Sequence, residues 1–184
     1  MSELTDNELM LLVKAGDLDK MSLLFKRHHR SLYRFLFNMT YNKEASEDMA
    51  QNVFYRMLKY RHTFTGKGEF IVWMFHLGRN MLKDNAKKQQ RRGKYNELDS
   101  ISEKIDEGIL ADEQLRKKQD QLLLHKALGK LNDDEREVLT LNKFLELKYY
   151  EIAQILNITE GAVKVRVHRA FNQLKNIYQQ NDLL

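Results

Sequence analysis

The sequence contains no cysteine and no proline, and it has only eight glycines in 184 residues. The absence of cysteine excludes disulfide bonds, thiolate catalysis and cysteine-ligated zinc, and it is typical of a reducing compartment such as the cytoplasm. Proline and glycine are the residues that usually end strands and form tight turns, and here one is absent and the other scarce. We therefore predict an all-α fold.

Long apolar runs are also missing. No run approaches the roughly 18 residues that a membrane-spanning helix needs, and the start, MSELTDNELM, lacks the basic and apolar segments of a signal peptide. We expect neither membrane insertion nor secretion. Positive charge, in contrast, is in excess: the formal net charge is +5, which suggests a polyanionic partner.

Periodicity and charge divide the chain into two helical modules. Apolar residues recur with helical spacing over about residues 5–91 and 114–178, and the polar, largely acidic stretch RRGKYNELDSISEKIDEGILADE lies between them. We predict a module over residues 1–92, a flexible acidic linker over 93–113 and a second module over 114–184. The linker is expected to be either a solvated tether or a segment held loosely against a basic surface.

The second module has the pattern of a helix-turn-helix. Asn132, followed three residues later by Glu135, predicts a helix start. The short amphipathic segment YYEIAQIL is then followed by the turn Asn157-Ile158-Thr159, in which Thr159 can cap a final helix over residues 160–178. Two helices joined by a three-residue turn form this motif.

The final helix is predicted to have one buried and one basic face. On a helical wheel the expected buried residues are Val163, Val167, Ala170, Phe171, Leu174, Ile177 and Tyr178. Opposite them lie Lys164, Val165, His168 and Arg169, so an apolar valine stands within a basic surface. In a DNA major groove, Val165 could contact a thymine methyl group while its basic neighbours reach base edges or phosphates. Arg166, at the border of the buried arc, suits a phosphate contact.

The first module offers two further polar surfaces. The helix after Asn42 has an apolar face that includes Tyr60, and its other face carries Asp48, Gln51, Asn52 and Tyr55. The segment HTFTGKGEF is predicted to be an exposed loop. The helix over residues 70–88 is apolar around most of its circumference, which predicts neighbours on most sides. Its single polar stripe could track phosphates and comprises His76, Arg79, Asn80, Lys83 and Lys87.

Aromatic residues at the start of this stripe could hold unpaired bases, because stacking on one base is worth roughly 1 to 3 kcal/mol. Phe70 and Trp73 are expected in the core, which leaves Phe64 in the loop as the better stacking candidate. His28 and His29 adjoin on a helix and cannot share a face, so no metal site is expected there.

Three segments together resemble a known family: SEDMAQNVFYRML, FTGKGEFIVWMFHLGRNMLKDNAKKQQRR and LNDDEREVLTLNKFLELKYYEIAQILNITEGAVKVRVHRAFNQL. Their order and spacing are similar to regions 2 and 4 of the sigma-70 family of bacterial RNA polymerase initiation factors, specifically its extracytoplasmic-function (ECF) group. Gly78 departs from the small apolar residue that is commoner at its position, and we expect it to loosen that helix by about 1 kcal/mol.

The resemblance implies a transcription initiation factor that binds core RNA polymerase, recognises minus-35 and minus-10 promoter elements and promotes strand opening. It implies no catalytic residue, cofactor, metal or small-molecule substrate, and an anti-sigma protein as a further partner. The face with Asp48 would bind polymerase. The minus-10 element would meet Phe64, Lys67, His76, Arg79, Asn80, Lys83 and Lys87. The minus-35 element would meet Lys164, Val165, Arg166, His168 and Arg169.

Two other hypotheses fit parts of the sequence. A stand-alone helix-turn-helix regulator would explain residues 131–178 but leave the polar stripe and the loop of the first module without a role. A helical adaptor would use both modules for protein partners and would show no salt-dependent promoter binding. An enzyme is the least favoured class, because no nucleophile or paired carboxylates occur in a suitable arrangement.

Overall fold

The computed structural model describes residues 4–91 and 122–181, and all regular structure within these ranges is helical. The prediction of an all-α fold is confirmed. The predicted linker, residues 93–113, lies outside the described residues. No helix in the described ranges is long and apolar enough to cross a membrane.

The N-terminal module contains the helices α1 (Asp6–Ala15), α2 (Lys20–Thr40), α3 (Lys43–Lys59) and α4 (Phe70–Arg91), and the short 3₁₀ helix η1 (Arg61–Thr63). Their boundaries follow from local chemistry. Thr5 and Glu8 form a capping box that begins α1, and the Asn42 side chain accepts a hydrogen bond from the backbone N–H of Ala45 to begin α3.

Helix α4 lies against α1, α2 and α3, as its nearly all-round apolar pattern predicted. Phe35 of α2 and Phe75 of α4 meet edge to face, with ring centroids 5.2 Å apart. A Cβ atom at Gly78 would lie 3.1 Å from Cδ1 of Leu32. The glycine therefore allows α4 to approach α2 closely, which offsets its low helix propensity.

The C-terminal module begins with a helix over residues 122–129. It continues with α6 (Asp133–Leu139), the π-helical turn η3 (Thr140–Phe144), α7 (Tyr149–Leu156) and α8 (Glu160–Asn181). Asn132 caps α6, Asn157 adopts a left-handed conformation after α7, and the Thr159 hydroxyl accepts from the N–H of Ala162 to begin α8. The predicted helix-turn-helix is confirmed as α7 and α8.

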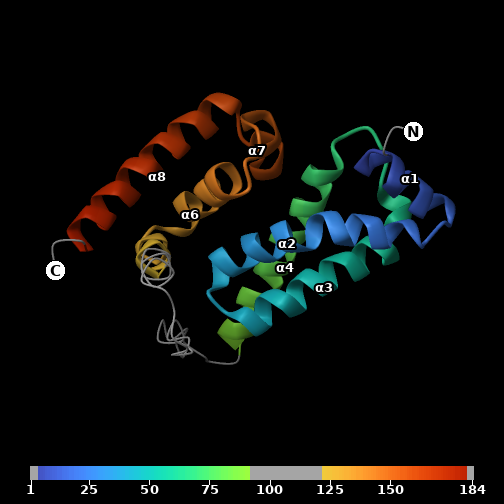
Figure 1. Ribbon diagram of the computed structural model, residues 1–184, viewed down its shortest axis with the longest axis horizontal. Coiled ribbons are helices and arrows are strands. Elements are labelled where there is room, and N and C mark those ends of the chain that lie inside the picture. Colours follow the sequence, from blue (N-terminus) through green and yellow to red (C-terminus); the bar gives the residue numbers. More distant parts are fainter. Residues whose placement is uncertain (1–3, 92–121, 182–184) are drawn as a thin grey trace, which may run out of the picture.

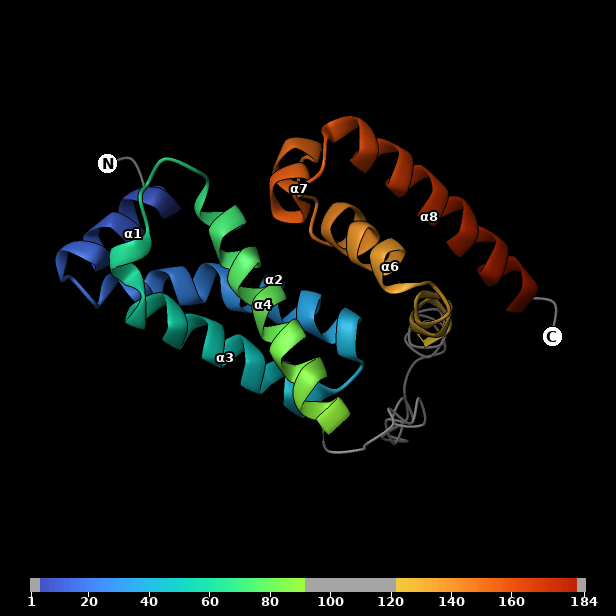
Figure 2. The ribbon, with the colours of Figure 1, turned by 180° about the vertical axis from the view of Figure 1, so that it is seen from behind.

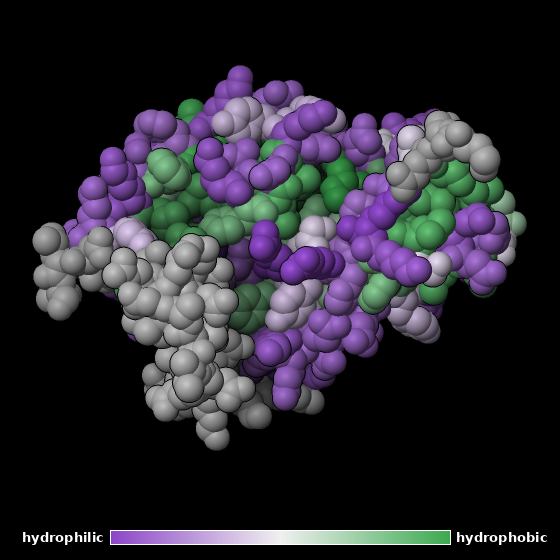
Figure 3. All heavy atoms as spheres, viewed as in Figure 1, coloured by the Kyte–Doolittle hydropathy of each residue, from purple (hydrophilic) through white to green (hydrophobic). Residues whose placement is uncertain are grey.

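The two modules lie against each other, with α6 beside α2 and α7 beside α4 (Figures 1 and 2). Their buried apolar residues form one contiguous cluster. Helix α8 runs along the outside of the molecule and extends beyond α6 (Figure 1). On the face shown in Figure 3, hydrophobic side chains gather over α1, where Leu11 and Leu12 are exposed.

Candidate nucleic-acid interface

The α8 face, defined by Lys164, Val165, His168 and Arg169, is exposed along its whole length. Val165 is 49% exposed, as its position on the helical wheel predicted. The Lys164 ammonium group lies 5.9 Å from the ring centroid of Tyr149, so α7 supports the start of this face. An accessible methyl-bearing side chain among cationic and imidazole groups has the chemistry needed to read base edges in a major groove.

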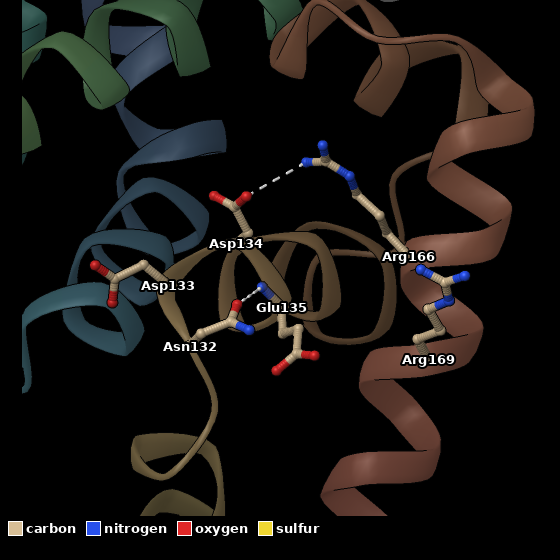
Figure 4. A pocket seen from close by; sticks show the side chains of 6 residues that line it. All are labelled: Asn132, Asp133, Asp134, Glu135, Arg166 and Arg169. Carbon is tan, nitrogen blue, oxygen red and sulfur yellow. Dashed lines mark hydrogen bonds and ion pairs between the residues drawn. The ribbon is translucent and has the colours of Figure 1, made fainter.

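Arg166 lies beside this face, in an open hollow of about 460 Å³ between α6 and α8 (Figure 4). The hollow is lined by Asn132, Asp133, Asp134, Glu135, Arg166 and Arg169. Arg166 Nη1 is 3.7 Å from Asp134 Oδ2, and both side chains are largely exposed. A pair this exposed contributes about 0 to 1 kcal/mol, so a DNA phosphate can compete with Asp134 for the guanidinium group.

One residue of the predicted buried arc of α8 is exposed, and two others, Ile177 and Tyr178, are only partly buried. Phe171 is 48% exposed, and the Lys143 ammonium group lies 5.7 Å from its ring centroid. Val163, Val167, Ala170 and Leu174 are buried as predicted. Phe171 is exposed because it stands at the edge of the arc, beside Lys164 on the helical wheel, whereas Leu174, further along α8, is buried.

The α3 face, defined by Asp48, Gln51, Asn52 and Tyr55, is exposed at all four positions. Two of its side chains bond within the helix: Asn52 donates to the Asp48 carbonyl at 2.8 Å, and Gln51 donates to Glu47 at 3.3 Å. Tyr55 is 61% exposed. The face is therefore ordered, polar and accessible to a partner.

Tyr60 was predicted on the buried side of this helix but is 42% exposed. The prediction is wrong because α3 ends at Lys59, and Tyr60 has φ −105° and ψ 19°. Its side chain no longer follows the helical wheel. The Lys59 ammonium group lies 5.5 Å from the Tyr60 ring centroid.

Phe64 does not occupy the exposed position that the loop pattern predicted. The side chain is only 3% exposed, and its ring centroid lies 5.1 Å from that of Trp73 and 6.4 Å from that of Phe70. The loop is tied to α1 on both sides of its tip: Lys14 donates to the Phe64 carbonyl at 2.6 Å, and Asn7 bonds to Gly68 and Phe70. These bonds turn the phenyl ring inward.

Other parts of the loop remain outside. Lys67 is exposed. Gly66 has φ +72° and packs against Leu11, where an added Cβ would lie 3.2 Å from Leu11 Cδ2. Phe70 is buried in the core, as predicted, and Trp73 is partly buried. The loop therefore exposes the Lys67 ammonium group rather than the Phe64 ring.

The α4 stripe, defined by His76, Arg79, Asn80, Lys83 and Lys87, is not exposed throughout. Asn80, Lys83 and Lys87 are exposed, whereas His76 and Arg79 are half-buried against the C-terminal module. The expectation that the whole stripe is open to solvent is therefore wrong at two positions. The reason is the packing of α7 on α4, which no pattern within either module encodes.

The Arg79 guanidinium group makes three hydrogen bonds to the C-terminal module. Nε donates to Glu137 Oε1 at 2.7 Å, Nη2 donates to Glu137 Oε2 at 3.2 Å, and Nη1 donates to the Ile155 carbonyl at 2.8 Å. The Glu137 side chain is only 11% exposed. A forked guanidinium–carboxylate pair of this kind fixes both direction and distance between its partners.

His76 lies next to this pair. Burial lowers the pKa of His76 below its ordinary value, the positive charge of Arg79 lowers it further, and a hydrogen bond to the Gln154 backbone opposes both effects. The imidazole is therefore neutral at pH 7 and adds no positive charge to the α4 stripe in this arrangement.

Sequence reasoning missed the residues of the C-terminal module and of α2 that complete this contact. Arg136 places its guanidinium carbon 5.5 Å from the ring centroid of Tyr41, and burial raises the pKa of Tyr41 to about 12, with Arg136 opposing. Arg34 donates to the Phe144 carbonyl at 3.3 Å. No periodic signal pairs Arg79 with Glu137, because 58 residues separate them.

The adjacent histidines of α2 have separate partners. His28 Nε2 lies 2.7 Å from Asp6, and His29 Nε2 lies 3.0 Å from Glu47. Within residues 4–91 and 122–181, no three His, Asp or Glu side chains are grouped so that they could hold a metal ion.

Comparison with known proteins identifies both modules. Residues 24–92 match the family described as Sigma-70 region 2, and residues 121–174 match Sigma-70, region 4. The chain is 30% identical over 156 residues to the ECF RNA polymerase sigma factor SigX of Bacillus subtilis, covering 83% of this chain and 80% of that protein. It is 26% identical to the ECF RNA polymerase sigma-E factor of Escherichia coli, covering 96% of each.

Two solved structures share the fold. CnrH, in complex with the cytosolic domain of CnrY, matches with a TM-score of 0.73 and 20% identity over 95% of this chain and 97% of that one. The sigma factor RpoE of Bartonella quintana, in complex with the anti-sigma factor NepR, matches with a TM-score of 0.70 and 23% identity over 86% and 96% of the two chains.

Proposed function

This chain belongs to the ECF group of the sigma-70 family, whose members are non-catalytic transcription initiation factors, and we propose that each of its three polar surfaces serves a different step of initiation. The α8 face reads the minus-35 element, the α4 stripe with Lys67 holds the minus-10 element, and the α3 face binds core RNA polymerase. The polymerase supplies the catalysis, and this chain needs no cofactor or small-molecule substrate.

The observation that carries this proposal is the exposed valine of the α8 face. Val165 is 49% exposed on the second helix of a helix-turn-helix, among Lys164, His168 and Arg169. An apolar side chain at the centre of a basic surface gains from contact with a thymine methyl group, while its neighbours bind base edges. Arg166 moves from Asp134 to a phosphate when duplex DNA occupies the face.

Strand capture falls to the exposed cations of the N-terminal module. Lys67, Lys83 and Lys87 are accessible to a phosphate backbone, and the Asn80 side chain offers both a donor and an acceptor to a base. Extruding a base costs a few kcal/mol, so these contacts suffice only when polymerase holds the chain in place. Since Phe64 is buried, it supports the loop from within.

The remaining assignments concern partners and organisation. The relatives CnrH and RpoE were solved with the cytosolic domain of CnrY and with the anti-sigma factor NepR, and we propose an anti-sigma partner for this chain too. We propose that it acts in the bacterial cytoplasm, with residues 1–92 and 114–184 as functional modules and 93–113 as their linker. A stand-alone helix-turn-helix regulator is not favoured, because it leaves the region 2 match without a role.

A titration of core polymerase with the fluorescently labelled chain tests the assignment of the α3 face. Replacing both Asp48 and Gln51 by Ala removes polar contacts at exposed positions and should change the free energy of unfolding by no more than about 0.5 kcal/mol per site. We expect clearly weaker holoenzyme assembly with unchanged helix content.

The control variant replaces Asp17 and Ser22 by Ala. Both residues are also exposed but lie near the turn between α1 and α2. This variant should assemble normally. If the Asp48/Gln51 variant and the parent chain bind core polymerase with equal affinity, the α3 face is not the polymerase-binding surface.

A further inference from the structure

The contact between the modules places Arg79, a member of the α4 stripe, inside an internal interface. Its guanidinium group uses Nε, Nη1 and Nη2 as donors toward Glu137 and the Ile155 carbonyl. The side chain is 21% exposed and that of Glu137 is 11% exposed. A carboxylate that accepts two parallel N–H bonds from arginine presents the same fork that a phosphate group presents.

We propose that Glu137 is an internal competitor of the DNA backbone: it takes the phosphate's place on Arg79 and holds the free chain in a closed state in which two of the five α4 stripe residues, His76 and Arg79, are partly covered. The inference rests on the proposed use of α4 for the minus-10 strand. Recognition of DNA by α8 does not require Glu137, so this role is additional to the proposed function.

Several contacts support a closed state built from both modules. His76 is half-buried beside the backbone of Gln154 in α7. At the other end of the interface, Tyr41 lies under the Arg136 guanidinium group and 3.8 Å from the position of a Cβ at Gly129. The interface therefore spans α4 with α7 and α2 with α6, so that separating the modules uncovers all of these groups together.

The nature of the central contact makes the state reversible. In a buried ion pair the electrostatic attraction is roughly balanced by the desolvation of the two charges. The pair therefore fixes the relative orientation of the modules more than it adds to the free energy of their contact. When the modules separate, water solvates Glu137, and Arg79 becomes available to a phosphate. The covered and uncovered states thus differ in the number of cations that DNA can reach, which couples opening to strand binding.

The consequence is a lower affinity of the free chain for single strands. If only a fraction of the molecules is open, the apparent dissociation constant is raised by the inverse of that fraction. Removing the carboxylate charge weakens charge-assisted hydrogen bonds, and we expect Glu137→Gln to tighten binding about tenfold. Glu44→Gln, at an exposed site of α3, makes the same change in net charge and should alter binding less than twofold.

The absence of cysteine makes the closed state directly measurable. Cysteines introduced at the exposed residues Lys59 and Lys175 accept a donor and an acceptor dye on α3 and α8. Energy transfer between the dyes then reports the module separation, and fluorescence anisotropy of a labelled oligothymidylate reports strand binding. Both are measured on the full chain, with circular dichroism as the check that each variant is folded.

The expected result is lower energy transfer and about tenfold tighter oligothymidylate binding for Glu137→Gln, with neither change for Glu44→Gln. Arg79→Lys keeps the positive charge but loses the fork, so it should also lower energy transfer while retaining strand binding. It serves as the second variant should Glu137→Gln not fold.

Two outcomes overturn the inference. Unchanged energy transfer in both Glu137→Gln and Arg79→Lys means that the pair does not hold the modules together, and the proposed surfaces are unaffected. Reduced transfer with oligothymidylate affinity no better than that of Glu44→Gln means that Arg79 does not meet the strand. That second result also removes Arg79 from the proposed minus-10 surface but leaves its exposed residues in place, and transcription by the parent holoenzyme tests the proposed function independently.

Discussion

Replacing Phe64 by Ala should destabilise the protein rather than remove a base-stacking surface. The phenyl ring is 3% exposed and packs on Trp73 and Phe70. Truncating a buried Phe to Ala costs about 3 to 5 kcal/mol. Because Phe64 lies in a loop that can partly collapse into the space, we expect the lower end, about 3 kcal/mol. For a chain of this size, that loss lowers the melting temperature by about 6 to 12 °C.

The assay is a urea titration followed by tryptophan emission. Trp73 is the only tryptophan in the sequence, and its ring centroid lies 5.1 Å from that of Phe64, so its emission reports the surroundings of the mutated ring. The matched control is Phe171→Ala, which deletes the same atoms at a 48% exposed position. We expect that control to lose less than about 1 kcal/mol.

Phe64→Leu separates packing from stacking. It keeps most of the buried volume and should cost less than about 1.5 kcal/mol, and the holoenzyme should still open promoter DNA. The reasoning is refuted if Phe64→Ala unfolds at the same urea concentration as Phe171→Ala, or if Phe64→Leu is stable but fails to melt duplex promoters while transcribing pre-opened templates. Either result would mean that the Phe64 ring contacts DNA rather than supporting the loop from within.

Three further outcomes are expected. On promoters substituted one base pair at a time, Val165→Ala should lose about 1 kcal/mol of discrimination between bases, mainly at one position. Arg169→Ala should lose about 1 to 3 kcal/mol at another position. Undiminished discrimination by the Val165→Ala variant would assign Val165 to a protein interface. Asp134→Asn should free Arg166, tightening binding to duplexes of any sequence and steepening the dependence of log K on log[salt] by up to about one unit; an identical slope contradicts the pairing. The raised pKa of Tyr41 means that the folded state retains its proton above pH 10, so the free energy of unfolding should fall between about pH 10 and about 12, and Tyr41→Phe should remove that fall in alkaline urea titrations.

Local chemistry was sufficient to predict several helix boundaries in the described residues. Asn132, Asn157 and Thr159 mark helix ends through hydrogen bonds and backbone conformations that span a few residues, and the structure contains them where the sequence placed them. The basic face with Val165 was equally predictable, because a helix exposes one side wherever its other side is packed.

The errors arise where distant segments meet. Phe64 turns inward because α1 bonds to its loop, and Arg79 is covered because α7 packs on α4. Phe171 is exposed because it stands at the edge of the buried arc of α8, where the covering helices do not reach around the side chain. A helical wheel describes one helix and assumes a partner along its full length, so it carries no information on which partner is present or where that partner ends.

The fork between Arg79 and Glu137 also limits how such factors can be recombined. If the N-terminal module of this chain were joined to the C-terminal module of another factor, this pair would set a condition for their compatibility. A donor module without an acidic side chain at the position of Glu137 leaves the guanidinium group unmatched. On the closed-state proposal, such a hybrid would differ from this chain in the way its modules rest against each other, apart from any change in the bases that it reads.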